Sequence, residues 1–215
     1  MNSGLSTGKA LIRCLKDSSG LNQTNLVIPV GHPVNAYLRV IPTVREKLDP
    51  VDLRLLSEWR NKYVKSFLTE FHAHPERTAK WLTEYVHQSD GKILFMLENL
   101  SGERLGHIGL AFIDWESGYG EADAIVSGGS SPPGLMKLAL QTTLKWARDQ
   151  LSLTTLGVRV RSDNTALEFY KKVGFEEIKR VPLRSEKNGE DINWFEDESF
   201  LAFEASLVYM IYRWS

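Results

Sequence analysis

The chain has 215 residues and carries 26 basic and 27 acidic side chains, so its formal net charge of −1 excludes a protein that recruits nucleic acid through an overall positive field. Hydrophobic residues make up 42% of the chain, as in soluble globular proteins, and no run of about 18 apolar residues is present to span a bilayer. The single cysteine, Cys14, excludes an intramolecular disulfide, and the N-terminus lacks the pattern of a secretion signal. We therefore expect a cytoplasmic monomer or homodimer, with neither nucleic acid nor membrane as a partner.

The N-terminal residues 1–25 differ in composition from the rest of the chain. They are rich in Ser, Asn and Gly around one short apolar segment, ALIRCL, and we interpret them as an appendage. The segment YLRVIPT, which begins at Tyr37, predicts the first strand of a single domain over residues 37–215.

Two helices are predicted after this strand. Asp49 followed by Pro50 is typical of a helix start, and the helix should run to about Lys65. A second helix should begin near Pro75 and end before Gly91, because apolar residues recur between them at helical spacing.

The middle of the chain predicts an antiparallel meander of three strands, KILFMLENL, RLGHIGLAFIDW and GEADAIVSG. A helix in PPGLMKLALQTTLKWARDQL and a strand in TTLGVRVRS should follow. After a further helix we expect a strand near EEIKRVPL, a polar loop SEKNGED and a final strand SLVYMIYRW. The element order is then β-αα-βββ-α-β-α-ββ, which indicates an α/β (α+β) fold with a mixed, largely antiparallel sheet.

The segment SDNTALEFYKKVGF predicts a short amphipathic helix with clear ends. Asp163 or Asn164 should cap its free amide groups, and Gly174 should end it in a left-handed conformation. Tyr170 falls on the buried face. From the residues alone, this tyrosine is either a packed core aromatic or a functional phenol.

The element order, with IVSGGSSPPGLMKLALQTTLKWARDQL and SDNTALEFYKKVGF, resembles the GNAT superfamily of acyl-CoA-dependent N-acetyltransferases over roughly residues 37–185. Trp59-Arg60-Asn61 and Trp81 resemble the branch of ribosomal-protein alanine and aminosugar N-acetyltransferases. The resemblance implies six or seven mostly antiparallel strands with helices on both faces. It also implies acetyl-CoA (coenzyme A) as the cofactor, bound where the fourth and fifth strands of the family's sheet splay apart.

The resemblance further implies that Tyr170 is the general acid that protonates the leaving sulfur. A phenol with an ordinary pKa near 10 is still protonated at neutral pH beside a thiol near 8.5. The chain departs from the family pattern in one respect, because six positions rather than seven separate Asn164 from Tyr170. Asp163 is therefore an alternative for the family's asparagine.

The strand GEADAIVSG contains the candidate general bases. Alternation should place Glu121, Asp123 and Ile125 on one face of the strand and Ala122, Ala124 and Val126 on the other. Two carboxylates on one face raise each other's pKa, as a general base requires, although plain surface acidity is the alternative. By resemblance we expect Glu121 to be the base, with Asp123 as the second candidate.

The cofactor-binding residues are also implied by the resemblance. The pantetheine arm should lie along Ile125, Val126 and Ser127, with the amide of Val126 at the thioester carbonyl. For the pyrophosphate we expect Ser131, Gly134, Leu135 and Met136, assisted by the amide of Ser130 and the charge of Lys137, and Asn164 completes the set. Pro132 and Pro133 depart from the family's glycine-rich loop and have no amide hydrogen to offer.

The candidates for binding the acceptor are Arg60, Asn61 and His107. We expect an aminosugar or a nucleotide-linked aminosugar as the acceptor amine, and a protein N-terminus or an amino acid as the second possibility. A non-catalytic module that retains the fold is the competing hypothesis. No metal site is predicted, because His72 and His74 lack partners at metal-ligand spacing, and one of them is expected to cap a helix.

Overall fold

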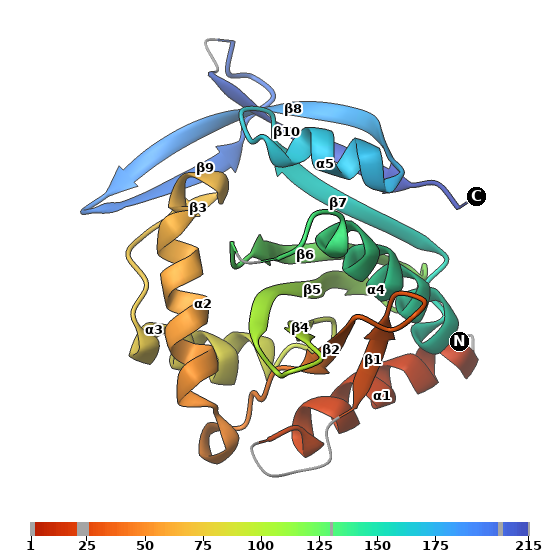
Figure 1. The fold of residues 1–215 in the computed structure, drawn as a ribbon. Helices are drawn as coiled ribbons and strands as arrows, with labels where there is room; N and C mark the ends of the chain where they lie inside the picture. The colour runs from red at the N-terminus through yellow and green to blue at the C-terminus, as the bar shows by residue number, and fades with distance from the viewer. Residues whose placement is uncertain (1–2, 21–25, 130, 202–203, 215) are drawn as a thin grey trace.

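The computed structural model of the protein describes residues 3–20, 26–129, 131–201 and 204–214 (Figure 1). Its strands are β1 (Val27–Val30), β2 (Ala36–Val40), β3 (Thr69–Glu70), β4 (Ile93–Asn99), β5 (Arg104–Asp114), β6 (Tyr119–Ser127), β7 (Thr155–Arg161), β8 (Phe175–Asn188), β9 (Asp191–Glu196) and β10 (Ala205–Tyr212). They form one sheet in the order β1-β2-β4-β5-β6-β7-β10-β8-β9-β3. Among these neighbours only β6 and β7 are parallel, so the described sheet is mostly antiparallel, as predicted.

Helices cover both faces of this sheet. They are α1 (Ser3–Ser18), α2 (Pro50–Lys62), α3 (Pro75–Lys80), α4 (Leu135–Leu151) and α5 (Ala166–Val173), with the short 3-10 helices η1 (Arg45–Lys47) and η2 (Val64–Ser66) and the π-helical segment η3 (Trp81–Val86), which continues from α3. One hydrophobic cluster joins the sheet to α1, α4 and α5, and a second cluster joins it to α2 and η3. Figure 1 shows α4 and α2 on different sides of the sheet. The predicted fold class and the two helical faces are confirmed.

The predicted helix starts are confirmed at atomic level. Asp49 caps α2, because its carboxylate accepts a hydrogen bond from the amide of Val51 at 2.8 Å. His74 caps α3 by accepting from the amide of Arg77 at 3.3 Å. The first of the two helices ends at Lys62, three residues earlier than expected.

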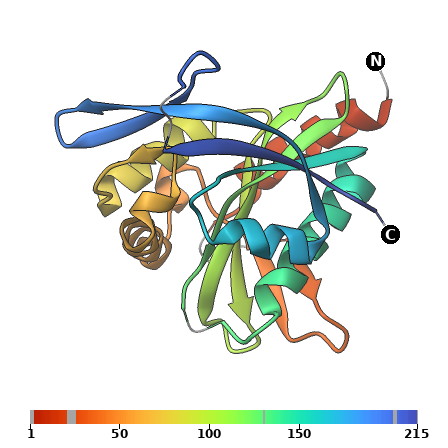
Figure 2. The same ribbon diagram turned by 90° about the horizontal axis from the view of Figure 1, so that it is seen from above.

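The expected count of six to seven strands is wrong, because β1, β3 and β9 join the sheet as well. The segment SEKNGED, expected to be a loop, forms the turn end of the β8–β9 hairpin, where Asn188 pairs with Asp191. Gly189 has φ 63° there, which a tight hairpin turn requires and which glycine adopts without strain. The hairpin reaches across to β3, which pairs with β9, so it lies beside the segment that joins α2 to α3 (Figure 2).

Helix α1 packs into the body of the protein. Leu5, Ile12 and Leu15 belong to the main hydrophobic cluster. The fully buried Lys16 donates hydrogen bonds to three backbone carbonyl oxygens around the end of η3. Residues 1–2 and 21–25 of the predicted appendage lie outside the described residues, so the boundary at residue 25 stays a prediction.

Candidate active site

The parallel strands β6 and β7 pair over only part of their length. Three residue pairs join them, and the last is Glu121 with Gly157. Beyond this pair lies a cavity of about 500 Å³, lined by residues 121–127 of β6 and 158–161 of β7. The expected gap between these two strands is therefore present.

A β-bulge in β6 shapes one wall of the cavity. Asp123 pairs with Gly109 of β5, and Val126 pairs with His107, so β6 has one more residue than β5 in this interval. Ala124 lies within the interval and has φ 50°, a conformation uncommon outside glycine.

The bulge overturns the alternation that we expected beyond Asp123. Ile125 packs against the cluster that contains Ala122, whereas Ala124 and Val126 pack against the cluster on the opposite face. The extra residue shifts the two-residue period of side chains by one position, so Ile125 does not share a face with Asp123.

The amide groups at the end of β6 point alternately toward β5 and toward the cavity. Gly128 donates its amide hydrogen to the carbonyl of Leu105 on β5 at 2.7 Å, and Val126, two residues earlier, pairs with the same strand. Residues two apart along a strand direct their amides to the same edge. The amides of Ile125 and Ser127 therefore face the cavity, whereas we had expected that of Val126 to do so.

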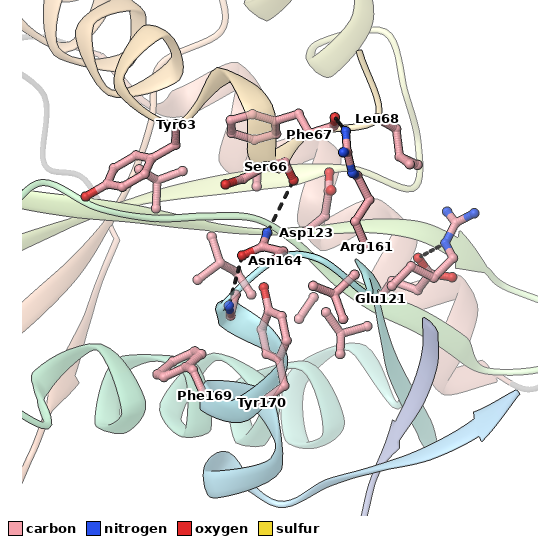
Figure 3. Close-up of a pocket in the computed structure, with 18 of the residues that line it drawn as sticks. Tyr63, Ser66, Phe67, Leu68, Glu121, Asp123, Arg161, Asn164, Phe169 and Tyr170 are labelled. Carbon is pink, nitrogen blue, oxygen red and sulfur yellow. Dashed lines mark hydrogen bonds and ion pairs between the residues drawn. The ribbon is translucent and has the colours of Figure 1, made fainter. Parts of the chain in front are cut away.

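Tyr170 lines the cavity from α5, and its hydroxyl is directed toward the side on which Asn164 lies (Figure 3). Its ring packs edge-to-face against Phe169 and Phe175, with centroid distances of 5.5 and 5.9 Å. Burial raises the pKa of the Tyr170 phenol, and the Asp123 carboxylate raises it further. The phenol is thus protonated at neutral pH, as a proton donor must be.

The start of α5 distinguishes the two candidate caps. The side-chain oxygen of Asn164 accepts from the amide of Ala166 at 2.9 Å, and its nitrogen donates to the carbonyl of Ser66 at 3.3 Å. Asp163 pairs instead with Arg161 at 2.7 Å. Of the two candidates, Asn164 therefore accepts the amide hydrogen at the start of α5, from the position before Thr165, and it lines the cavity as well.

The two candidate bases both line the cavity, but their partners differ. Glu121 accepts from the Tyr119 hydroxyl at 2.8 Å through Oε1 and pairs with Nε of Arg159 at 2.7 Å through Oε2. Asp123 pairs through Oδ2 with Nζ of Lys92 at 2.7 Å. It is also the carboxylate that raises the pKa of the phenol on α5.

The segment expected to bind pyrophosphate lies outside the lining of this cavity. The Ser131 hydroxyl donates to a β5 carbonyl at 2.9 Å, and the amide of Leu135 donates to the carbonyl of Pro132 at 3.1 Å. Gly134 precedes α4 with φ 84°, so its position requires glycine or a strained residue. Ser130 lies outside the described residues.

The first turn of α4 still presents amide groups. Leu138 donates its amide hydrogen to the carbonyl of Gly134 at 3.1 Å and so begins the helical ladder. The amides of Met136 and Lys137 precede it, in the turn that helix geometry leaves without intrahelical acceptors. The side chain of Met136 packs against the main hydrophobic cluster.

Arg60 and Asn61 lie on α2 and outside the cavity lining. The Arg60 guanidinium lies over the ring of Phe67, 3.6 Å from its centroid. Asn61 exchanges two hydrogen bonds with the backbone of Ala73, at 2.8 and 2.7 Å. Both residues therefore hold the segment after α2, whose residues 66–69 form a wall of the cavity, instead of lying in the cavity as we expected of acceptor ligands.

His107 also lies outside the lining. Its imidazole is 6% exposed and stacks on Trp59 with ring centroids 6.0 Å apart. Burial lowers the pKa of His107 to about 4, although the backbone of Ala124 and the carboxylate of Asp123 act in the opposite direction. The imidazole is thus neutral at pH 7, and it packs between β5 and Trp59 of α2.

Two arginines of β7 that were not among the predicted site residues line the cavity. Arg161 bonds to Glu70 at 3.0 Å and to Asp163 at 2.7 Å, and Arg159 pairs with Glu121. The signal was present in the segment GVRVR, because arginines two residues apart in an apolar strand must share one face.

No group of three or more His, Cys, Asp or Glu side chains in the described residues is placed to hold a metal ion. No helix within the described ranges is long and apolar enough to cross a membrane. Cys14 is exposed on α1.

Comparison with known proteins places this geometry in context. Residues 38–176 match the family described as "Acetyltransferase (GNAT) domain". No curated protein matches the chain. Among solved structures, the spermidine N-acetyltransferase from Vibrio cholerae in complex with CoA and spermine is similar, with 16% identity, a TM-score of 0.63, and coverage of 82% of this chain and 94% of that chain. A chimera of that Vibrio cholerae enzyme, SpeG, with hSSAT has 17% identity, a TM-score of 0.62, and coverage of 83% and 95%. At such identities the likeness establishes a shared fold.

The neutral His107 should make the protein less stable in acid. Its pKa is about 4 in the folded chain against an ordinary 6.5, so between these values the unfolded chain binds more protons and stability is lost as pH falls. The shift corresponds to about 3 kcal/mol in the free energy of unfolding. We expect His107→Gln to lose this part of the pH dependence in urea titrations from pH 4 to 7. The exposed His72→Gln is the control, and equal slopes for wild type and His107→Gln would contradict the assignment.

Proposed function

Because the chain belongs to the acetyltransferase (GNAT) family and is an acyl-CoA-dependent N-acetyltransferase, we propose that its acceptor is a small primary amine held in the cavity between β6 and β7. One observation carries this proposal: Tyr170 and Asp123 line the same cavity, at the point where the pairing of the two strands ends. Acetyl-CoA supplies the acetyl group as an activated thioester.

The donor's arm fits the open edge of β6. The amides of Ile125 and Ser127 are available to hydrogen-bond an extended chain and the thioester carbonyl, and Val158 and Val160 provide an apolar opposite wall. At the start of α4, free amide groups and the charge of Lys137 suit a pyrophosphate. These groups fit coenzyme A, even though the loop before α4 lacks the glycine-rich pattern.

An amine in water is mostly ammonium and must lose a proton before it attacks. Asp123 is the better placed base, since its Oδ1 is not the oxygen that bonds to Lys92, whereas both oxygens of Glu121 have protein partners. We therefore place Asp123 first and Glu121 second, which reverses the order expected from the sequence.

The leaving sulfur needs a proton as the carbon–sulfur bond breaks. Tyr170 is protonated at neutral pH and lines the cavity, whereas Lys171 and Lys172, the other proton donors on α5, do not line it. After the transfer Asp123 holds the proton taken from the amine, and a buried phenolate is unfavourable, so a proton can return from Asp123 to Tyr170 and restore both groups.

The charges of the cavity bear on which amine is accepted. Its two lining carboxylates, Glu121 and Asp123, are each paired with a cation, and Arg161, which also lines the cavity, is itself paired with Glu70 and Asp163. A polyamine, the acceptor named for the Vibrio cholerae enzyme, needs unpaired carboxylates for its additional ammonium groups. A monoamine is therefore favoured, with an aminosugar or nucleotide-linked aminosugar first and a protein N-terminus or amino acid second.

A non-catalytic module is the second candidate, because Pro132 and Pro133 remove two amides from the loop before α4. The wild-type protein should be stabilised against heat by acetyl-CoA and should release free thiol with glucosamine, alanine-terminated peptide or spermidine in a colorimetric assay. We expect both effects, with glucosamine turned over faster than spermidine. If acetyl-CoA stabilises the protein but none of the three amines leads to release of free thiol, the non-catalytic module is favoured.

Replacement of Tyr170 by Phe should lower kcat by about 100-fold or more, because general acid catalysis contributes about that much. The dissociation constant for acetyl-CoA, measured by calorimetry, should change less than twofold. Tyr85→Phe, at a tyrosine that is 65% exposed, is the matched control and should be silent. Because the pKa of Tyr170 is raised, no fall in kcat below pH 10 should be due to its ionisation. A kcat of Tyr170→Phe within twofold of the wild-type value would argue against the role.

Asp123→Asn should reduce kcat/KM most at low pH, where almost all of the amine is protonated and depends on a base. The loss should shrink toward pH 9, and Glu121→Gln should have the smaller effect at each pH. A pH–rate profile of all three proteins measures this, and a uniform effect of Asp123→Asn at every pH would remove it from proton transfer.

A further inference from the structure

Phe112 on β5 combines two features that are rare in one residue. Its side chain is 59% exposed, and its backbone has φ 51°. The register shifts there, because Ala111 pairs with Glu121 and Asp114 with Tyr119, which leaves one extra residue on β5. Single exposed apolar side chains are common, but a bulky residue with positive φ is a true outlier, and such strain clusters at functional sites.

The ring of Phe112 lines the same cavity as the catalytic candidates. The guanidinium of Arg159 lies over it, 4.1 Å from the ring centroid, and Nε of Arg159 bonds to Glu121 at 2.7 Å. Arg159 also lies over Tyr209, at 5.8 Å. The ring is therefore held in place by Arg159, while most of its surface faces solvent.

Phe112 lies at the Glu121 end of the cavity, since its neighbour Ala111 pairs with Glu121. Figure 3 shows Glu121 on the opposite side of the cavity from Tyr63. The side near Tyr63 adjoins the loop before α4, because Lys62 lies against Gly129. The donor's pyrophosphate and Phe112 are thus at opposite ends, which leaves Phe112 for the acceptor.

An exposed phenyl face binds flat apolar surfaces, either another aromatic ring or the apolar face of a pyranose. A phenyl face also attracts cations, but the guanidinium of Arg159 already lies over this ring, and its positive charge opposes the approach of an ammonium group. The residues at the Glu121 end of the cavity therefore suit an acceptor in which a ring carries a single amine.

We propose that Phe112, held by Arg159, is the residue that determines acceptor specificity, and that it stacks on a ring carried by the acceptor amine. The proposal rests on the proposed function, because it assigns the non-reacting part of the same acceptor. Phe112 contacts this part of the acceptor only, so it acts on acceptor binding and not on the chemical step.

The test measures kcat and KM of wild type, Phe112→Ala, Phe112→Asn and Phe112→Tyr with glucosamine, phenethylamine and the ring-free amines ethanolamine and spermidine. Asn adopts positive φ readily, so Phe112→Asn removes the ring while easing the backbone strain. We expect Phe112→Ala and Phe112→Asn to raise KM for the ring amines about tenfold. Their kcat and their KM for acetyl-CoA should stay within twofold of the wild-type values. Phe112→Tyr should retain the wild-type values. The ring amine whose KM rises more in Phe112→Ala identifies the preferred ring, a pyranose for glucosamine or an aromatic ring for phenethylamine.

Phe195→Ala, at an exposed phenylalanine on β9 outside the cavity lining, is the matched control and should be silent. Equal KM changes for ring and ring-free amines in the Phe112 variants, or none for either, would overturn the stacking role while leaving the proposed function intact. Wild-type protein that binds acetyl-CoA but acetylates no amine would instead overturn the proposed function and the stacking role together.

Discussion

The candidate site depends on one interruption of backbone hydrogen bonding. The parallel pair β6–β7 stops after Glu121 and Gly157, although both strands continue. A bulge at Ala124 bends β6 immediately beyond that point and turns the amides of Ile125 and Ser127 toward the opening. An unpaired strand edge normally requires protection, and here its free groups are what an extended thioester donor needs.

Paired charges hold the cavity walls in position. Glu121 with Arg159 links β6 to β7 directly below the gap, and Asp123 is tied to Lys92, which precedes β4. Such partly buried pairs contribute little net stability, because desolvation offsets their attraction. Their effect is to fix two carboxylates in the lining of the cavity that contains Tyr170, each with a cationic partner.

The far end of the sheet completes the cavity. Strand β3 comes from the segment between α2 and α3, yet it pairs with β9 of the C-terminal hairpin. Glu70 on β3 accepts from Nε1 of Trp194 at 2.8 Å and from Arg161 at 3.0 Å, so one carboxylate joins β3, β9 and β7. Residues remote in the chain thereby hold the wall formed by residues 66–69 against the gap.

The sequence by itself determined most of the element order after residue 37, the cap at Asp49, a histidine cap at His72 or His74, and the place of Tyr170 on the buried side of α5, because periodicity and capping depend on near neighbours. It also carried the family resemblance that the match over residues 38–176 confirms. Only the tertiary structure decided which amides of β6 are free, and that Arg159 lies between Glu121 and an aromatic ring. These features depend on register and on pairing between strands far apart in the chain, where a single bulge reverses every side chain that follows it.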